Sequence, residues 1–131
     1  MSQENVELAR RIGDAINRRD LEVVEELFHP DFEFHSAIAR SEGGIYNGVD
    51  GMRDYFRDID DAWDAFRIDL EGVREAGEQV VILWHVRATS RSGVPLDQVI
   101  AQIWTWRDGM PWRNESFTNL RDALEAVGLP E

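Results

Sequence analysis

The sequence contains no cysteine. This absence excludes disulfide bonds, thiol nucleophiles and metal sites built on cysteine. Histidine is also scarce, with three residues in a chain of 131, and so few imidazoles do not favour a metal site built on several of them. We therefore expect neither a metal ion nor another cofactor.

Long apolar stretches and an excess of basic residues are missing as well. The longest apolar run, Val80 to Trp84, is far shorter than the roughly 20 residues that cross a bilayer. The first residues, MSQENVELARR, lack the apolar centre of a signal peptide. The net charge of −12 disfavours nucleic acids and anionic membranes, because both bind basic patches. We expect a cytoplasmic protein.

What the chain does contain predicts a single domain over residues 1–131. Its length and its hydrophobic content of 43% are sufficient for a core. Apolar residues at helical spacing predict helices within residues 2–17, 20–28, 49–63 and 120–127, begun by the caps Ser2, Asp20 and Asn119 where a cap is visible. Alternating apolar residues predict strands at 31–36, 66–71 and 79–89 and a hairpin over 97–118.

Helices cluster early in this order and antiparallel strands cluster late. That arrangement indicates an α+β fold, in which a curved antiparallel sheet carries helices on one face. Residues 37–47 are expected to form a loop, because glycines at positions 43, 44 and 48 interrupt both kinds of pattern.

The strand predicted over Gln79–Thr89 has two different faces. One face is apolar throughout: Val80, Ile82, Trp84, Val86 and Ala88. The other begins apolar and ends polar: Val81, Leu83, His85, Arg87 and Thr89. Either the sheet is covered on one side and leaves His85 and Arg87 in water, or both sides are covered. In the second case the apolar face packs on another subunit and the graded face lines a cup closed by the helices.

The hairpin is predicted by Asp108-Gly109 between two β-like runs. Its register decides which side chains share a face, because a slip of one residue turns one strand over. A two-residue turn pairs Arg107 with Met110 and sets Gln102 opposite Glu115. This register separates the polar residues of the two strands.

A three-residue loop, with Gly109 as the left-handed residue of a bulge, gives the other register. It pairs Trp106 with Met110 and sets Gln102 opposite Asn114. The neighbouring pairs are then Ile100 with Ser116 and Trp104 with Trp112. We prefer this register, because it gathers the amides, hydroxyls and indoles on one face.

Four segments, in this order and spacing, resemble one known superfamily. They are LFHPDFEFH at the end of the second helix, GIYNGVDGMRDYF entering the third, IAQIWTWRDG in the hairpin and TNLRDALEAVGL at the close. The chain resembles the NTF2-like superfamily, in particular its SnoaL-like branch of cyclase- and isomerase-related proteins. The resemblance implies a cone: a strongly bent antiparallel sheet wrapped around the N-terminal helices, with a pocket inside. It also implies a homodimer through the outer face of the sheet.

The resemblance does not fix a reaction, since the superfamily includes isomerases, cyclases, hydrolases, dehydratases and non-catalytic binders. Its ketosteroid isomerases use a tyrosine and two acids, which correspond by spacing to Ile12, Ser36 and Gln102 here. None of the three keeps the isomerase residue, which argues against that mechanism. Whether the protein is an enzyme stays open.

Our candidate catalytic residues are His85, whose imidazole suits proton transfer near neutral pH, and Arg87, which can bind a carboxylate or enolate oxygen. The alternatives are a hydrogen-bonded histidine at the sheet rim and a surface salt bridge. The candidate ligand-binding residues are Ser36, Tyr46, Gln102, Trp104, Asn114 and Ser116. For the amides the alternative is a hydrogen bond that only satisfies buried polar groups, and for the aromatic residues it is packing.

Three hypotheses follow from these residues. The first is an enzyme, or an enzyme-derived protein, that acts on a small and largely apolar molecule by acid–base chemistry. The second is a non-catalytic protein that binds such a molecule. The third is a dimeric interaction module whose pocket is filled by its own aromatic side chains.

Overall fold

The computed structural model describes residues 3–36, 45–117 and 119–130. Its helices are α1 (Gln3–Arg18), α2 (Leu21–Leu27), α3 (Gly48–Ala62) and α4 (Leu120–Ala126). Its strands are β1 (Glu33–His35), β2 (Ile45–Asn47), β3 (Trp63–Ala76), β4 (Gln79–Ser90), β5 (Pro95–Arg107) and β6 (Met110–Phe117). The predicted order is confirmed except for β2, which occupies the end of the expected loop.

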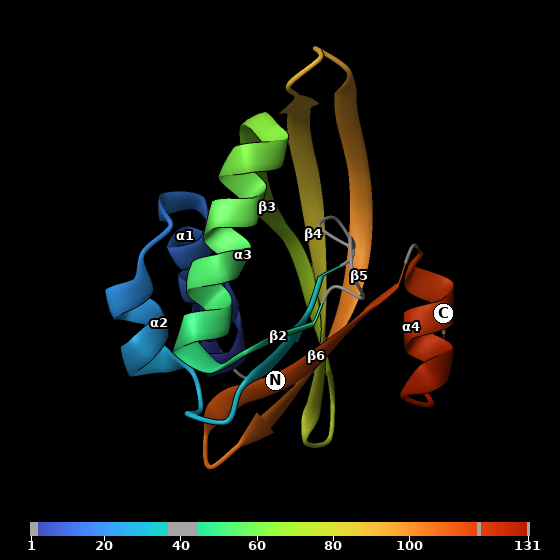
Figure 1. Cartoon of the computed structure of the whole chain (residues 1–131). Helices are drawn as coiled ribbons and strands as arrows, with labels where there is room; N and C mark the ends of the chain where they lie inside the picture. The colour runs from blue at the N-terminus through green and yellow to red at the C-terminus, as the bar shows by residue number, and fades with distance from the viewer. Residues whose placement is uncertain (1–2, 37–44, 118, 131) are drawn as a thin grey trace.

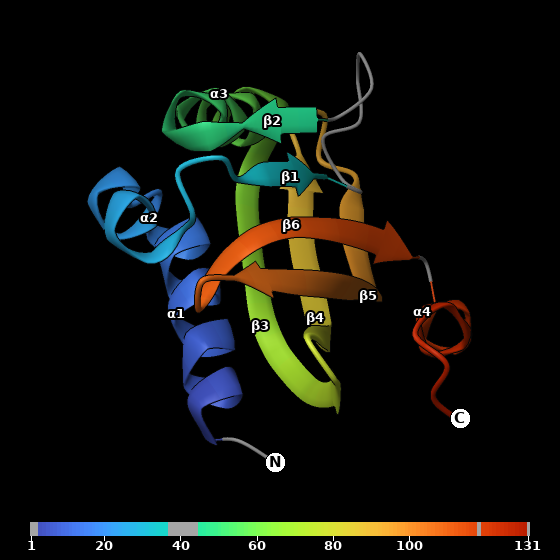
Figure 2. The same cartoon turned by 90° about the horizontal axis from the view of Figure 1, so that it is seen from below.

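The six strands form one sheet in the order β2-β1-β6-β5-β4-β3. Neighbours are antiparallel except β1 and β6, which run in parallel. The sheet bends around α1, α2 and α3, and α4 lies on its opposite side (Figure 1, Figure 2). We call the face toward α1–α3 the inner face and the face toward α4 the outer face. The predicted α+β cone is confirmed.

Two of the predicted caps begin helices. The Asp20 side chain accepts a hydrogen bond from the backbone N–H of Val23, and Asn119 accepts one from Asp122 at 2.9 Å. Each bond satisfies a donor that the first helical turn leaves without a partner. The predicted cap Ser2 and the last residue of the predicted hairpin, Thr118, lie outside the described residues.

The apolar face of β4 is the inner face. Val80 and Trp84 are buried in the main core with side chains of α1, α2 and α3. On the outer face Val81 packs with residues of α4, His85 is half-buried and Arg87 is exposed. The prediction that the apolar face packs on a second subunit and the graded face lines the cup is wrong. Helices of the same chain already cover the apolar face.

The turn between β5 and β6 has two residues. Asp108 and Gly109 have φ angles of 55° and 76°, the left-handed pair that a type I′ turn requires. Arg107 therefore pairs with Met110. The three-residue loop that we preferred is wrong.

A β-bulge next to the turn then changes the register. The pair Trp106–Pro111 is followed by the pair Thr105–Arg113, so Trp112 is the extra residue on β6. The turn dipeptide gives no sign of this bulge, because a bulge depends on how the strands must bend rather than on the turn itself.

Beyond the bulge, Gln102 lies opposite Ser116 and Trp104 lies opposite Asn114. Both predicted registers missed these pairs. The four side chains nevertheless share one face, as predicted, because the extra residue restores the alternation that the two-residue turn would have reversed.

Strand β2 was not predicted from the sequence, because it is only three residues long. It pairs antiparallel with β1, and Tyr46 lies opposite Phe34. Three residues are too few to show an alternation of period two. Gly43 and Gly44 of the predicted loop lie outside the described residues.

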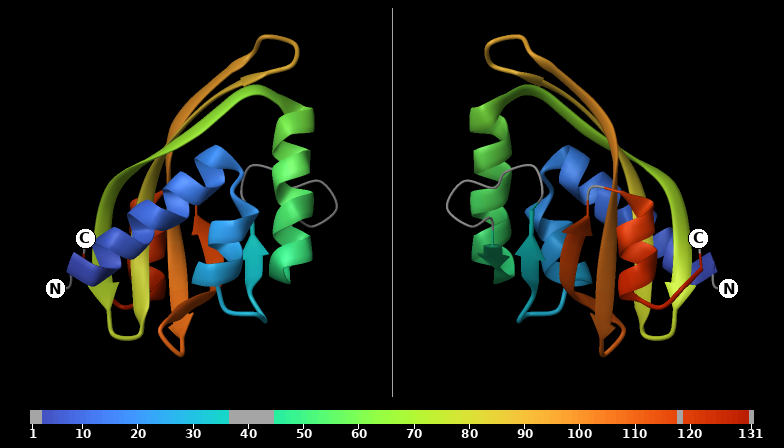
Figure 3. Two further views of the ribbon diagram at one scale, coloured as in Figure 1. Left: turned by 90° about the vertical axis from the view of Figure 1, so that its left-hand side faces the viewer. Right: turned by 90° about the vertical axis from the view of Figure 1, so that its right-hand side faces the viewer.

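Helix α1 lies directly on the sheet and protects its edge strand β3. The Asn17 amide donates to the Ile68 carbonyl at 2.8 Å and accepts from the Ile68 N–H at 2.9 Å, as a neighbouring strand would. A Cβ on Gly13 would stand 2.9 Å from the Trp84 ring, so this glycine allows the close approach. Figure 3 shows α1 running obliquely across the inner face.

Candidate functional site

The inner face encloses a small cavity. Its volume is about 20 Å³, which is room for about one water molecule. Aromatic and aliphatic side chains, such as Phe34 and Trp84, form most of its wall. Its polar groups come from Ser36, Tyr55 and Gln102. None of the described residues that line it is Asp, Glu or His.

Gln102 is the polar centre of this cavity and is only 5% exposed. Its Oε1 accepts hydrogen bonds from the indole N–H groups of Trp84 at 2.8 Å and Trp104 at 2.9 Å. Its Nε2 donates to Ser116 Oγ at 3.1 Å. An indole N–H can only donate, so the two tryptophans fix which end of the amide is the oxygen. Both acceptor positions of the oxygen are used, which leaves Gln102 only a second N–H to offer.

Tyr55 and Ser36 bring two hydroxyl groups to the same cavity. Tyr55 comes from α3, Ser36 follows β1, and the two side chains are hydrogen-bonded to each other. Burial raises the pKa of Tyr55 above its usual range. The phenol is therefore neutral at physiological pH and can donate a hydrogen bond.

Tyr46 stands beside this cluster rather than inside it. Its ring centre is 5.2 Å from that of Tyr55, and its hydroxyl donates to Asp58 Oδ2 at 2.8 Å. Burial, followed by the contact with the Asp58 carboxylate, raises the pKa of Tyr46 to about 12. This tyrosine joins β2 to α3 and does not line the cavity.

Phe66 lines both this cavity and a wide concavity of about 700 Å³, which residues on both sides of the sheet, such as Arg19 and Arg87, border. We call this concavity the mouth of the cone. The Arg19 guanidinium lies 5.7 Å from the ring centre of Phe66, and Trp63 packs on that ring at 6.4 Å. The mouth is also braced by Arg91 of the β4–β5 turn, which donates to backbone carbonyls at the C-terminal end of α3. Figure 3 shows this turn above the end of α3.

Asn114 and Ser116 join β1 to β6. These strands share one backbone pair, Glu33 with Arg113. Beyond it, Asn114 Oδ1 accepts from the His35 N–H at 2.7 Å and Ser116 Oγ donates to the His35 carbonyl at 3.1 Å. The two predicted ligand-binding residues thus satisfy strand backbone groups and do not line the inner cavity.

His85 and Arg87 lie on the outer face. The His85 ring bridges two neighbouring strands, with Nδ1 3.1 Å from Glu71 and Nε2 2.5 Å from Asp97. Side chains of a strand alternate between its faces, so β4 directs Trp84 to the cavity and His85 away from it. The prediction that His85 and Arg87 share a cup with Gln102 is wrong.

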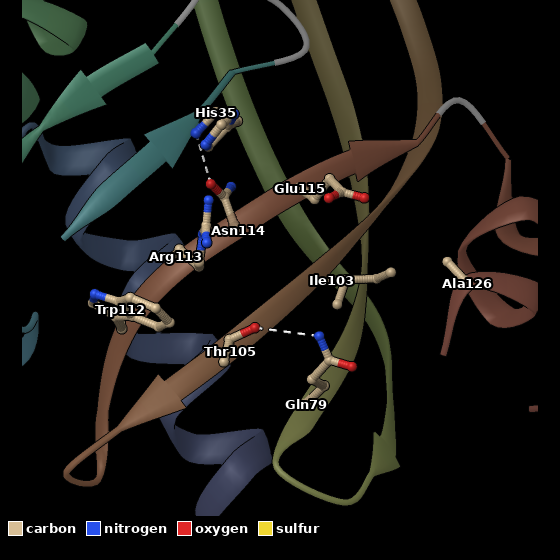
Figure 4. A pocket seen from close by; sticks show the side chains of 9 residues that line it. All are labelled: His35, Gln79, Ile103, Thr105, Trp112, Arg113, Asn114, Glu115 and Ala126. Atoms are coloured by element: carbon tan, nitrogen blue, oxygen red, sulfur yellow. Dashed lines mark hydrogen bonds between the residues drawn. The ribbon is translucent and has the colours of Figure 1, made fainter. Parts of the chain in front are cut away.

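A second hollow lies on the outer face between β1, β6, β5 and α4. Its volume is about 380 Å³. Figure 4 shows side chains from all four elements around it, among them His35, Arg113 and Ala126. The predicted residue Asn114 borders this hollow, and its amide lies in the gap between β1 and β6 (Figure 4).

Within residues 3–36, 45–117 and 119–130, no three His, Asp or Glu side chains are grouped so as to hold a metal ion. None of the described helices combines the length and the apolar character needed to cross a membrane.

The pattern that describes the SnoaL-like domain family matches residues 9–114. This match covers most of the chain, including β1 to β5 and the first part of β6. The chain belongs to the SnoaL-like family. None of the curated proteins matches the sequence of this chain.

Solved structures share the fold of this SnoaL-like chain over nearly its whole length. An NTF2-like protein of unknown function from Burkholderia pseudomallei K96243 is 23% identical, with a TM-score of 0.77 over 97% of this chain and 98% of that one. TerC, co-crystallised with polyporic acid, is 22% identical, with a TM-score of 0.77 over 96% and 99%. A candidate SnoaL-like polyketide cyclase from Jannaschia sp. CCS1 is 21% identical, with a TM-score of 0.70 over 100% and 98%. At sequence identities this low, the structural likeness establishes the NTF2-like fold and nothing further.

The cavity of this SnoaL-like protein gathers only part of the predicted site. Ser36 and Gln102 line it, and Trp104 is buried beside Gln102. Sequence reasoning missed Tyr55 and Trp84 as partners of the polar centre. Helical spacing could have found Tyr55, which follows the buried Met52 by three residues, but the spacing does not reveal that its hydroxyl faces a cavity.

Proposed function

We propose that the inner cavity is the binding site for a small, largely apolar molecule that carries a hydrogen-bond acceptor. The observation that supports this is the donor set of Ser36, Tyr55 and Gln102 inside an aromatic core. Gln102 has no acceptor capacity left, because two indoles occupy its oxygen. Tyr55 stays protonated because burial raises its pKa. A carbonyl or enolate oxygen is the complementary group.

Binding requires more room than the cavity holds. Its 20 Å³ is far below the roughly 300 Å³ or more that is usual for a ligand pocket. Among the residues that the structure describes, only Phe66 lines both this cavity and the 700 Å³ concavity at the mouth. We propose that the ligand enters from the mouth, turns the Phe66 ring aside and reaches Gln102.

We propose binding, rather than acid–base catalysis, as the function of this cavity. A general acid or base must come within hydrogen-bond reach of the reacting group. His85 and Arg87 are on the far side of the sheet from Gln102, and no described carboxylate or imidazole lines the cavity. The alternative, that the protein is an enzyme, is supported by the structural likeness to a candidate polyketide cyclase. In that case Tyr55 would be the proton or hydrogen-bond donor.

The test compares variants that keep the shape of the site. Glutamate at position 102 keeps an acceptor for both indoles and, when ionised, offers no donor, so Gln102→Glu should repel an acceptor ligand. Because a buried charge lowers stability, circular dichroism must first show that this variant is folded. Gln98→Glu adds the same charge at an exposed position of β5 and serves as its control. The probe is polyporic acid, with which TerC was co-crystallised, and calorimetry measures its dissociation constant.

Wild type and Gln98→Glu should bind the probe equally, and Gln102→Glu should bind it at least about tenfold more weakly, as the loss of a buried hydrogen bond implies. Tyr55→Phe should weaken binding by a similar factor. Equal affinity in all four proteins would refute the site. Turnover of the probe would refute a purely binding role.

Two further expectations stay predictions: a cytoplasmic location and a homodimer through the outer face. For the dimer we propose the region around Val99, which is 45% exposed and pairs with His85. An exposed apolar side chain beside a charge cluster suits a contact between subunits. Sedimentation equilibrium tests it, since Val99→Glu should give a monomer if this region is the interface.

A further inference from the structure

A hollow of the sheet's outer face, bordered by β1, β4, β5, β6 and α4, has no role in the cone site. Its 380 Å³ falls within the size range of small-molecule sites, whereas the inner cavity does not. Gln79, Thr105 and Ile103 form its floor, and Ala126 of α4 forms one wall (Figure 4). We call it the outer groove. It belongs to neither the proposed cone site nor the Val99 region.

One end of the outer groove is rich in hydrogen-bond donors. Glu33 contacts both His35 Nε2 at 2.6 Å and Arg113 at 3.0 Å. The hydrogen bond from His35, helped by Arg113, keeps the pKa of Glu33 below its usual value. The carboxylate engages one nitrogen of the Arg113 guanidinium, so other N–H groups of that fork are left to face the groove.

Asn114 adds a donor with no partner. The residue is 3% exposed, and its Nδ2 has no hydrogen-bond acceptor among the described residues. Its Oδ1 is held by the backbone N–H of His35, so the amide cannot turn over without losing that bond. A buried amide N–H without a partner is costly. Because this Nδ2 is buried in the β1–β6 gap, an acceptor satisfies it only by entering the gap from the groove.

Trp112 holds the cationic groups of this end in place. The guanidinium carbons of Arg107 and Arg113 lie 4.8 Å and 5.3 Å from its ring centre. A ligand that reaches Arg113 would then lie with its body over Ile103 and beside Ala126. The groove thus pairs a cationic, donor-rich end with an apolar floor.

We propose that the outer groove binds a small organic carboxylate. The carboxylate accepts from the Arg113 guanidinium at the groove, one of its oxygens enters the β1–β6 gap to accept from Asn114 Nδ2, and the apolar part of the molecule rests on Ile103. Arginine suits this task because its planar fork matches the two oxygens of a carboxylate. The nearby Glu115 and the net charge of −12 oppose anions in general, so the local donors must supply the selectivity.

The groove is separate from the other surfaces along β4. Gln79 at the start of the strand borders the groove, Val81 packs with α4, and His85 follows beyond it. A dimer around Val99 and His85 therefore lies on the other side of α4. Binding in the groove and binding in the cone can be measured independently.

The experiment is a titration of ¹⁵N-labelled protein with benzoate, followed by NMR, with benzamide as the uncharged probe of the same shape. Benzoate should shift the Asn114 side-chain signals and the backbone signals of residues 103–105 and 113–115. Benzamide should bind about tenfold more weakly, since it cannot form the charge-assisted bonds.

Variants separate the two donors. Arg113→Gln should weaken benzoate binding about tenfold, while Arg67→Gln, which removes the same charge from the outer face of β3, should not. Asn114→Asp keeps an acceptor for His35 but removes the donor, and it should also weaken binding. Ser116→Ala loosens the same strand joint and should leave binding intact. If Asn114→Asp does not fold, the Arg113→Gln and Arg67→Gln pair decides the matter.

Three results would overturn the proposal. They are an absence of shifts in these residues at about 10 mM benzoate, where even millimolar affinity would be visible, equal binding by wild type and Arg113→Gln, and shifts confined to Gln102 and Tyr55. The last result would assign benzoate to the cone. Gln102→Glu should leave the groove signals unchanged, so a failure of the cone proposal does not carry over to this one.

Discussion

On each face of the β4–β5 strand pair a polar side chain connects two neighbouring side chains, but the two faces use different interactions. On the inner face, the Gln102 amide joins Trp84 to Trp104 through neutral hydrogen bonds that are fully buried. On the outer face, His85 joins Glu71 to Asp97 through contacts at the solvent-exposed surface. Buried hydrogen bonds are costly to leave incomplete, whereas exposed ion pairs contribute little. The polar residues inside the cone therefore contribute more to its stability than the charged residues on the outer face.

The largest expected effect comes from removing the inner amide. Gln102→Leu leaves the indole N–H groups of Trp84 and Trp104 without an acceptor, at about 1 to 3 kcal/mol for each buried group. We expect the free energy of unfolding to fall by about 2 to 6 kcal/mol, measured by urea denaturation.

The control for this variant is Gln102→Glu, which keeps an acceptor for both indoles. Compared at a pH below about 4, where its carboxyl group is protonated and neutral, it should lose less stability than Gln102→Leu, whereas the ionised carboxylate would itself be costly to bury. If the two variants were equally unstable, the cost would come from packing around position 102, and the inner face would lose its special place in the comparison.

The sequence predicted correctly that the side chains of β4 alternate between two faces. It did not predict which of the two faces is enclosed by the helices. Val80 to Ala88 and Val81 to Thr89 do lie on opposite sides, as period two requires. Which side is enclosed depends on where α1, α2 and α3 pack, and the strand pattern contains no information on that. The charged end of the graded face suggested a functional cup, whereas the structure pairs His85 with carboxylates at the surface.

The sequence predicted a residue of the candidate site only where the residue type and its position together allow a single structural role. Gln102 between apolar strand positions was recognisable as a buried polar group that needs partners. Its partners depend on the bulge at Trp112, which sets Ser116 opposite it and has no local signal. In the sequence Tyr55 cannot be distinguished from any other core position of an amphipathic helix, because helical spacing predicts burial but not the position of the hydroxyl group.

The next effect concerns the wall of the inner cavity. Phe66→Ala should join the cavity to the concavity at the mouth, at a cost of about 2 kcal/mol for a half-buried ring. Stopped-flow fluorescence should then show faster association and faster dissociation of polyporic acid. Phe117→Ala, which removes a partly buried ring that packs near α4 on the outer face, should lower stability without changing these rates. Unchanged rates in Phe66→Ala would mean that Phe66 does not control entry.

The smallest expected effect lies on the outer face, where the hydrogen bond from His85 holds the pKa of Asp97 below its usual value. A carboxyl group whose pKa is lowered by folding stabilises the protein above the ordinary aspartate pKa near 3.9, and this contribution disappears as the pH falls through the lowered value. Asp97→Asn should therefore be slightly less stable than wild type at neutral pH and should converge with it at acid pH. Urea midpoints measured across this range test the difference, and Asp31→Asn, which removes an exposed carboxyl group elsewhere on the surface, gives the baseline. A loss at neutral pH as large as that of Gln102→Leu would break the comparison, because an exposed ion pair would then matter as much as a buried amide.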